Sequence, residues 1–167
     1  MLYGAISLLA ALALAGIDQI IKFWAVANLQ PVGTMPLIPG ILELRFVLND
    51  GMAFSLLSGQ RWLLIGATSV MLIALLVLLF RRDLSLPERI AWVLVVGGGI
   101  GNLIDRVQTG VVVDYLNVLF MEFAVFNFAD ICVCVGIGLV ILLLVLEMIR
   151  EHKAAKEKAS SPDHGTA

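Results

Sequence analysis

Charged residues are scarce in this sequence: 14% of its 167 residues are Asp, Glu, Lys or Arg, while 60% are hydrophobic. A soluble domain typically has about 25% charged and about 45–50% apolar residues. The deficit therefore excludes an ordinary soluble domain and indicates a protein that crosses a membrane several times. A net charge of −2 is also too small to indicate a nucleic-acid partner.

Histidine and cysteine are nearly absent as well. Both histidines, His152 and His164, follow the last apolar run, so the polar residues elsewhere cannot form a histidine-based triad or metal site. The sequence contains no P-loop motif for binding phosphate. Cys132 and Cys134 are metal ligands, disulfide partners or small apolar filler. Because positions i and i+2 of a helix point apart, filler is favoured.

Long apolar runs dominate what is present, and four of them can cross about 30 Å of hydrocarbon, which takes about 20 helical residues. They cover about Leu2–Ala27, Trp62–Phe80, Ile90–Val107 and Phe128–Ile149. The first run lacks the basic start of a cleaved signal peptide and is longer than its usual apolar core, so we expect a retained span. The predicted fold class is an all-α polytopic membrane protein with four transmembrane helices.

The chain is expected to form a single membrane-embedded domain over residues 1–167. The segment from about 153 to 167 is charged and then contains Ser, Pro and Gly, which predicts a disordered tail. Four spans place both termini on one side of the membrane. That side carries Arg81, Arg82, Arg89, Arg150, Lys153, Lys156 and Lys158, against Lys22, Arg45, Arg61 and Arg106 on the other. We therefore expect both termini to be cytoplasmic and the polar segments to lie at the outer face.

The longest segment outside the spans covers residues 28–60. Its prolines and glycines between positions 31 and 40 exclude a continuous helix. Leu42–Phe46 alternates apolar and polar residues as a half-buried strand does, and Asn49-Asp50-Gly51 is a strong turn signal. Residues 52–57 continue as a second strand or a short amphipathic helix. We predict a small extracytoplasmic β-containing subdomain between spans 1 and 2, able to cover a lipid-bearing ligand.

Ionisable residues within the spans are costly, so each requires an explanation. Asp18 and Lys22 are four residues apart and can pair on one helix face. The alternative is a lysine that extends to the interface beside its counter-ion. Asn102, Asp105 and Arg106 form one polar face of the third span. They support a reaction or, alternatively, form a buried polar network that fixes helix packing.

Asp114 and Asp130 are the candidates for a catalytic pair. Asp114 follows three β-branched residues, and Asp130 lies in the first turn of the fourth span. Asn127 is a suitable N-cap, which makes Asp130 at N3 alternatively a capping acid favoured by the helix dipole. The apolar, irregular stretch Leu119–Val125 between them is typical of a re-entrant or interfacial loop. Its presence does not show that the two aspartates meet.

Two close carboxylates can hydrolyse an amide bond without other groups. Like charges cannot both ionise easily at short range, so one carboxyl stays protonated. The ionised one activates a water molecule, and the protonated one hydrogen-bonds the scissile carbonyl and later helps the amine to leave. Such a pair titrates as a unit, so the individual roles stay unassigned.

Five short motifs follow one another along nearly the whole chain. They are Asp18-Gln19-x-x-Lys22, Asn49-x-Gly51-x-Ala53-Phe54, Gly98-Gly99-x-Gly101-Asn102-x-x-Asp105-Arg106, Val112-Val113-Asp114-Tyr115 and Phe126-Asn127-x-Ala129-Asp130. In this order they resemble the motifs of the lipoprotein signal peptidases (signal peptidase II, aspartic peptidase family A8). Phenylalanine is commoner in that family at the position of Tyr115.

The resemblance implies an intramembrane aspartic endopeptidase of the bacterial cytoplasmic (inner) membrane. Such an enzyme removes signal peptides from diacylglyceryl-modified prolipoproteins and cuts just before the lipidated cysteine. It implies Asp114 and Asp130 as the catalytic pair, no metal or organic cofactor, and inhibition by globomycin-type cyclic peptides. A monomer is expected. The residues matching those that bind substrate or support the site are Asp18, Lys22, Asn49, Asn102, Asp105, Arg106 and Asn127.

Two other classes of protein are compatible with aspartates in a membrane. An intramembrane aspartic protease of the presenilin kind is disfavoured, because no Gly-x-Gly-Asp motif precedes either candidate and four spans are few. A small transporter or proton-coupled carrier would use the aspartates to bind a ligand, and such carriers often place the acid in mid-span. Asp114 and Asp130 instead lie near span ends.

Overall fold

A computed structural model of the chain describes residues 2–51 and 56–160. Four long helices account for most of it: α1 (Leu2–Trp24), α2 (Arg61–Arg81), α3 (Leu86–Gln108) and α4 (Phe128–Ser160). A π-helical turn, η1 (Ala25–Leu29), prolongs α1. All four helices are long and apolar enough to cross a membrane. The predicted class, a polytopic membrane protein with four helical spans, is confirmed.

Two helices are longer than the apolar pattern predicts. α3 begins at Leu86 rather than near Ile90, because Ser85 and Glu88 form a reciprocal capping box at its start. α4 continues to Ser160, whereas disorder was expected from about residue 153. Residues 150–156 are exposed and include several strong helix formers, which favour the helix through their intrinsic propensity. Residues 161–167 of the expected tail lie outside the described residues.

α3 is the helix around which the others pack. Three consecutive glycines along it approach three different helices, because each residue turns the helix by about 100°. A Cβ atom at Gly97 would lie 2.8 Å from the Leu14 side chain of α1, and one at Gly99 would lie 2.9 Å from Leu72 of α2. At Gly98 it would lie 2.3 Å from the Ala129 carbonyl oxygen of α4. Glycine is therefore required for α4 to begin against α3.

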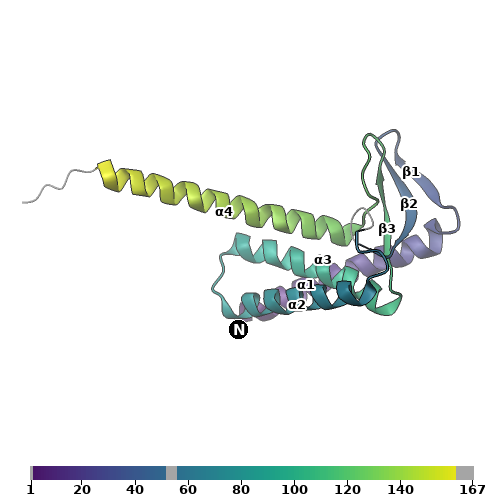
Figure 1. The fold of residues 1–167 in the computed structure, drawn as a ribbon, viewed down its shortest axis with the longest axis horizontal. Helices are drawn as coiled ribbons and strands as arrows, with labels where there is room; N and C mark the ends of the chain where they lie inside the picture. The colour runs from purple at the N-terminus through teal and green to yellow at the C-terminus, as the bar shows by residue number, and fades with distance from the viewer. Residues whose placement is uncertain (1, 52–55, 161–167) are drawn as a thin grey trace, which may run out of the picture.

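A three-stranded antiparallel sheet stands at the end of the bundle where α4 begins (Figure 1). Its order is β1 (Thr34–Ile38), β2 (Leu42–Asn49) and β3 (Val112–Val118). The predicted strand at Leu42–Phe46 is confirmed as part of β2. β1 was not predicted, because Pro36 lacks a backbone donor, which an edge strand tolerates. The second motif residues Ala53 and Phe54, and the alternatives for residues 52–55, lie outside the described residues.

The third strand was not expected in this sheet, since it comes from the connection between α3 and α4. β2 and β3 pair so that Asn49 lies opposite Val112 and Val47 opposite Asp114. This pairing brings the end of β2, which belongs to the segment between α1 and α2, next to Asp114, which belongs to the segment between α3 and α4. Both ends of the described chain lie at the opposite end of the bundle from the sheet (Figure 1).

Candidate active site

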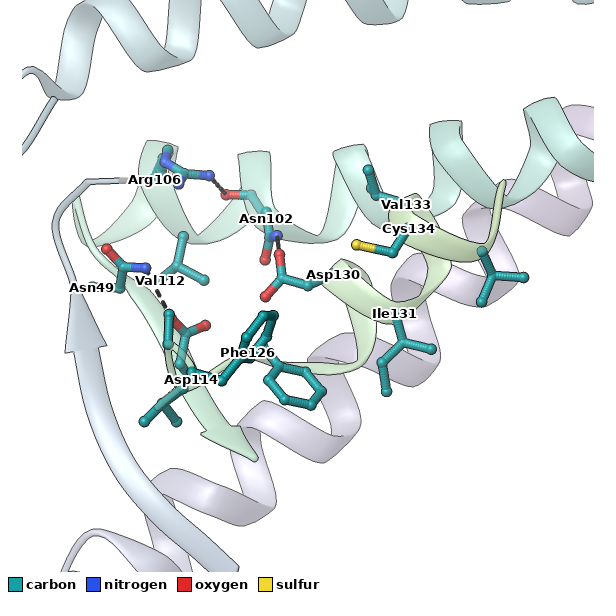
Figure 2. A pocket seen from close by; sticks show the side chains of 14 residues that line it. Asn49, Asn102, Arg106, Val112, Asp114, Phe126, Asp130, Ile131, Val133 and Cys134 are labelled. Carbon is teal, nitrogen blue, oxygen red and sulfur yellow. Dashed lines mark hydrogen bonds between the residues drawn. The ribbon is translucent and has the colours of Figure 1, made fainter. Parts of the chain in front are cut away.

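Asp114 and Asp130 line one cavity, although they come from different elements. Asp114 lies on β3 with 2% of its surface exposed, and Asp130 lies in the first turn of α4. The cavity has a volume of about 410 Å³ and continues along α3 and α4, so we call it the helix-side cavity. Figure 2 shows both carboxylates directed into this space from opposite walls. The structure therefore brings the predicted pair together.

The cavity is lined by three kinds of residue. Polar and charged side chains surround the two acids, and apolar side chains of β3, of α4 and of the 123–126 segment form the rest. The lining residues are Asn49, Asn102, Arg106, Val112, Asp114, Phe123, Ala124, Val125, Phe126, Asp130, Ile131, Val133, Cys134 and Val135. Cys132 and Cys134 are both free thiols, consistent with the filler interpretation.

Two asparagines link the carboxylates. The amide nitrogen of Asn127 donates to Asp114 Oδ1 at 2.6 Å and to Asn102 Oδ1 at 3.1 Å. The amide nitrogen of Asn102 in turn donates to Asp130 Oδ1 at 2.8 Å. The pair is thus joined by a continuous path of hydrogen bonds that fixes where each carboxylate lies.

A third asparagine holds the other oxygen of Asp114. Asn49 donates from its amide nitrogen to Asp114 Oδ2 at 2.9 Å, while its own oxygen accepts from the Gly51 backbone N–H. In the same way, Asn102 Oδ1 accepts from Lys22 Nζ at 2.8 Å. Each amide oxygen is occupied by a donor, so each amide nitrogen is turned toward an aspartate.

The start of α4 is held by side chains from β3, from α1 and from the residue that directly precedes α4. Its first N–H groups have no partner within the helix and need one elsewhere. Phe128 N–H donates to the Tyr115 hydroxyl oxygen, Ala129 N–H to Asp18 Oδ1, and Asp130 N–H to Asn127 Oδ1. Asp130 Oδ2 accepts from the Asn127 N–H, which completes a capping box. Asp130 is therefore a capping acid and also faces the cavity with Asp114.

Tyr115 is a residue whose role could not be predicted from its position in the motif. It is 4% exposed, and burial raises the pKa of its hydroxyl, which keeps the group neutral. We expect Tyr115→Phe to destabilise the protein by about 1–2 kcal/mol, because the Phe128 N–H loses its acceptor. Thermal unfolding in detergent measures this. Tyr3→Phe, the same change at a residue 67% exposed, is the control; equal effects of the two would contradict the anchoring role.

A buried ionic cluster is connected to the pair of aspartates through Asn102. Lys22 Nζ lies 2.8 Å from Asp18 Oδ2 and 2.8 Å from Asp105 Oδ2, and the Lys22 side chain is 3% exposed. Gln19 joins the cluster by donating to Asp105 Oδ1 at 2.8 Å. The predicted pairing of Asp18 with Lys22 is confirmed, but as a buried contact rather than a lysine extended to the interface. A Cβ atom at Gly101 would lie 2.6 Å from Asp18 Oδ2, so glycine at this position leaves room for the Asp18 carboxylate.

Two arginines secure the end of α3 nearest the sheet. Arg106 Nη2 donates to the Gly51 carbonyl oxygen at 2.7 Å, which joins α3 to the turn that follows β2. Arg61, from the start of α2, donates to the carbonyl oxygens of Arg106 and Val107. Arg61 was not a predicted site residue, and only its position at the start of a span distinguishes it in the sequence. The hydrogen bonds and ion pairs described above connect all seven predicted supporting residues to one another and to the two aspartates.

The electrostatic environment makes Asp114 easier to protonate than an aspartate in water. Burial raises the pKa of Asp114 from 3.8 to about 6, and the neighbouring charge of Asp130 contributes to the increase. The hydrogen bonds from Asn49 and Asn127 act in the opposite direction because they stabilise the carboxylate. An aspartate whose pKa is near neutrality is suited to exchange a proton during a reaction.

Comparisons with known proteins agree on one family. Residues 10–146 match the family described as Signal peptidase (SPase) II. A protein named lipoprotein signal peptidase from Streptococcus pyogenes serotype M2 is 37% identical over 123 residues, which cover 73% of this chain and 81% of that one. The protein of that name from serotype M6 of the same species matches to the same extent.

Two solved structures have the same fold. One, described as a bacterial membrane enzyme structure obtained by the in meso method at 2.3 Å resolution, has a TM-score of 0.77 and 28% identity. The match covers 98% of this chain and 95% of that one. The second, with the same description at 1.9 Å, has a TM-score of 0.74 and 32% identity, over 84% and 92% of the two chains.

Proposed function

Because the chain belongs to the signal peptidase II family of lipoprotein signal peptidases, which are aspartic peptidases, we propose that Asp114 and Asp130 are its catalytic pair. One observation carries the assignment: the two carboxylates face one cavity and are joined through Asn127 and Asn102. In the proposed reaction the ionised carboxylate takes a proton from water, whose oxygen attacks the scissile carbonyl carbon. The protonated carboxyl hydrogen-bonds the carbonyl oxygen and then gives its proton to the departing nitrogen as the C–N bond breaks.

The proposed substrates are bacterial prolipoproteins that carry diacylglycerol on a cysteine, cut on the amino side of that cysteine. The pair lies at the end of the bundle, beside the sheet, so a substrate anchored in the bilayer reaches it without leaving the membrane. The apolar residues of α4 that line the helix-side cavity, such as Ile131, Val133 and Val135, suit an apolar signal segment. Globomycin-type cyclic peptides would occupy the same cavity.

We propose that both termini are cytoplasmic and that the site lies at the outer face of the bacterial cytoplasmic membrane. The end of the bundle opposite the sheet carries the arginines of the α2–α3 turn and the basic residues late in α4. Such residues concentrate on the cytoplasmic side. We also propose a monomer. Surfaces with small residues such as Gly97 and Gly101 often pack against a helix of another chain, but here α1 of the same chain covers this surface.

Cleavage of a synthetic prolipoprotein peptide by the purified protein in detergent tests the function. We expect one cut, immediately before the diacylglyceryl-cysteine, and no cut in the same peptide without lipid; mass spectrometry of the products identifies the bond. Equal cleavage of both peptides would contradict the lipid requirement. No cleavage by folded protein would favour the carrier alternative.

A further inference from the structure

A second cavity adjoins Asp114 on the side of the sheet. It has a volume of about 540 Å³ and shares Asn49, Asp114 and the 123–125 segment with the helix-side cavity. Its other walls come from the end of β2, from Asn117 and Val118 of β3, and from residues 121–122. We call it the sheet-side cavity. Asp114 thus lies between a mainly apolar cavity that follows α4 and a more polar cavity that follows the sheet.

The two cavities differ in charge. The helix-side cavity contains Arg106 in addition to the two candidate catalytic acids. Among its described lining residues, the sheet-side cavity has no lysine or arginine, and besides Asp114 it carries Asp50 and Glu122. Asp50 Oδ2 accepts a hydrogen bond from the neutral Ser58 hydroxyl at 2.6 Å. The described lining of this cavity therefore carries acidic side chains and no basic ones.

We propose that the sheet-side cavity binds the residues that follow the lipidated cysteine, and that Asp50 and Glu122 select against acidic residues there. The inference rests on the proposed function. A peptide cut beside Asp114 must extend away from it in two directions, and the two cavities provide them. The apolar signal segment fits the cavity that enters the membrane-spanning part of α4. The polar start of the mature protein then leaves through the sheet-side cavity.

The size of the selection follows from the exposure of the two side chains. Asp50 and Glu122 are both exposed, so each interacts with a substrate charge through solvent. Single exposed charge pairs change an equilibrium by up to about fivefold. Two carboxylates that attract lysine and repel aspartate should together give about a 5- to 20-fold preference in kcat/KM. High salt should reduce the preference, because it screens exposed charges.

The test uses three lipidated peptides that differ only at the second residue after the cut, which is Lys, Gln or Asp. For the wild type we expect kcat/KM to decrease in that order. Glu122→Gln should reduce the Lys-to-Asp ratio about two- to fivefold, and Glu122→Lys should reverse the preference. The control is Glu147→Gln, the same change at an exposed residue of α4 that lines neither cavity. A ratio is used because general damage to the enzyme lowers all three rates alike.

Each outcome decides between the two proposals. If the wild type cleaves all three peptides equally well, the sheet-side cavity is not the path of the mature segment, and the proposed function stands. If Glu147→Gln changes the ratio as much as Glu122→Gln does, the selection comes from the net charge of the protein, and the cavity assignment fails. If the wild type cleaves none of the peptides, the proposed function fails and this inference fails with it.

Discussion

Asp114→Asn and Asp130→Asn are each expected to lower kcat/KM for the lipidated peptide by about 100- to 10,000-fold. Asparagine has nearly the same shape as aspartate, but its amide group cannot take a proton from water or return one to a leaving nitrogen. The double variant should be little slower than either single variant, because the two carboxyls act as one unit. Asp83→Asn, at an exposed position between α2 and α3, is the control and should retain full activity.

A change in folding must be separated from a change in chemistry. The pKa of Asp114 is raised in the folded protein, from 3.8 to about 6, so its ionisation destabilises the fold as the pH rises through that interval. Asparagine does not ionise. The stability of Asp114→Asn relative to the wild type should therefore increase between pH 4 and pH 7 in thermal unfolding experiments.

An active, folded Asp130→Asn would contradict the catalytic role of Asp130 and would mean that it serves only as the cap of α4.

Lys22→Met is expected to destabilise the protein strongly, by about 3–5 kcal/mol. The substitution leaves the buried carboxylates of Asp18 and Asp105 without the ammonium group that lies 2.8 Å from each. It also removes the donor that orients the Asn102 amide toward Asp130. Denaturant unfolding in mixed micelles gives the free energy, and activity should be lost together with stability.

The matched control is Lys153→Met, which removes an exposed lysine from the late part of α4. A similar, small effect of both substitutions would show that water reaches the Lys22 cluster in the micelle. A triple variant that also carries Asp18→Asn and Asp105→Asn should recover part of the lost stability. Neutral amides have no net charge to leave unpaired, although the amide oxygen introduced at position 18 would still have to accept from the Ala129 N–H.

Local patterns in the sequence determined the parts of this protein that depend on neighbouring residues. The four spans follow from the length of the apolar runs, since a helix needs about 20 residues to cross the hydrocarbon. The contact of Asp18 with Lys22 follows from their spacing on one helix turn. The capping box of Asn127 and Asp130 follows from their three-residue spacing. These contacts are set by helix periodicity alone.

Only the tertiary structure decided how those parts meet. Pairing of β3 with β2 places Asp114 beside Asn49, and the close approach of α4 to Gly98 of α3 places Asp130 beside Asn102. These contacts join segments far apart in the chain, and no periodicity encodes them. The capping and cavity-facing positions of Asp130 also proved compatible, because its two carboxylate oxygens point to different partners. Spacing assigns a residue to an element and a face, whereas long-range packing determines which residue lies opposite it.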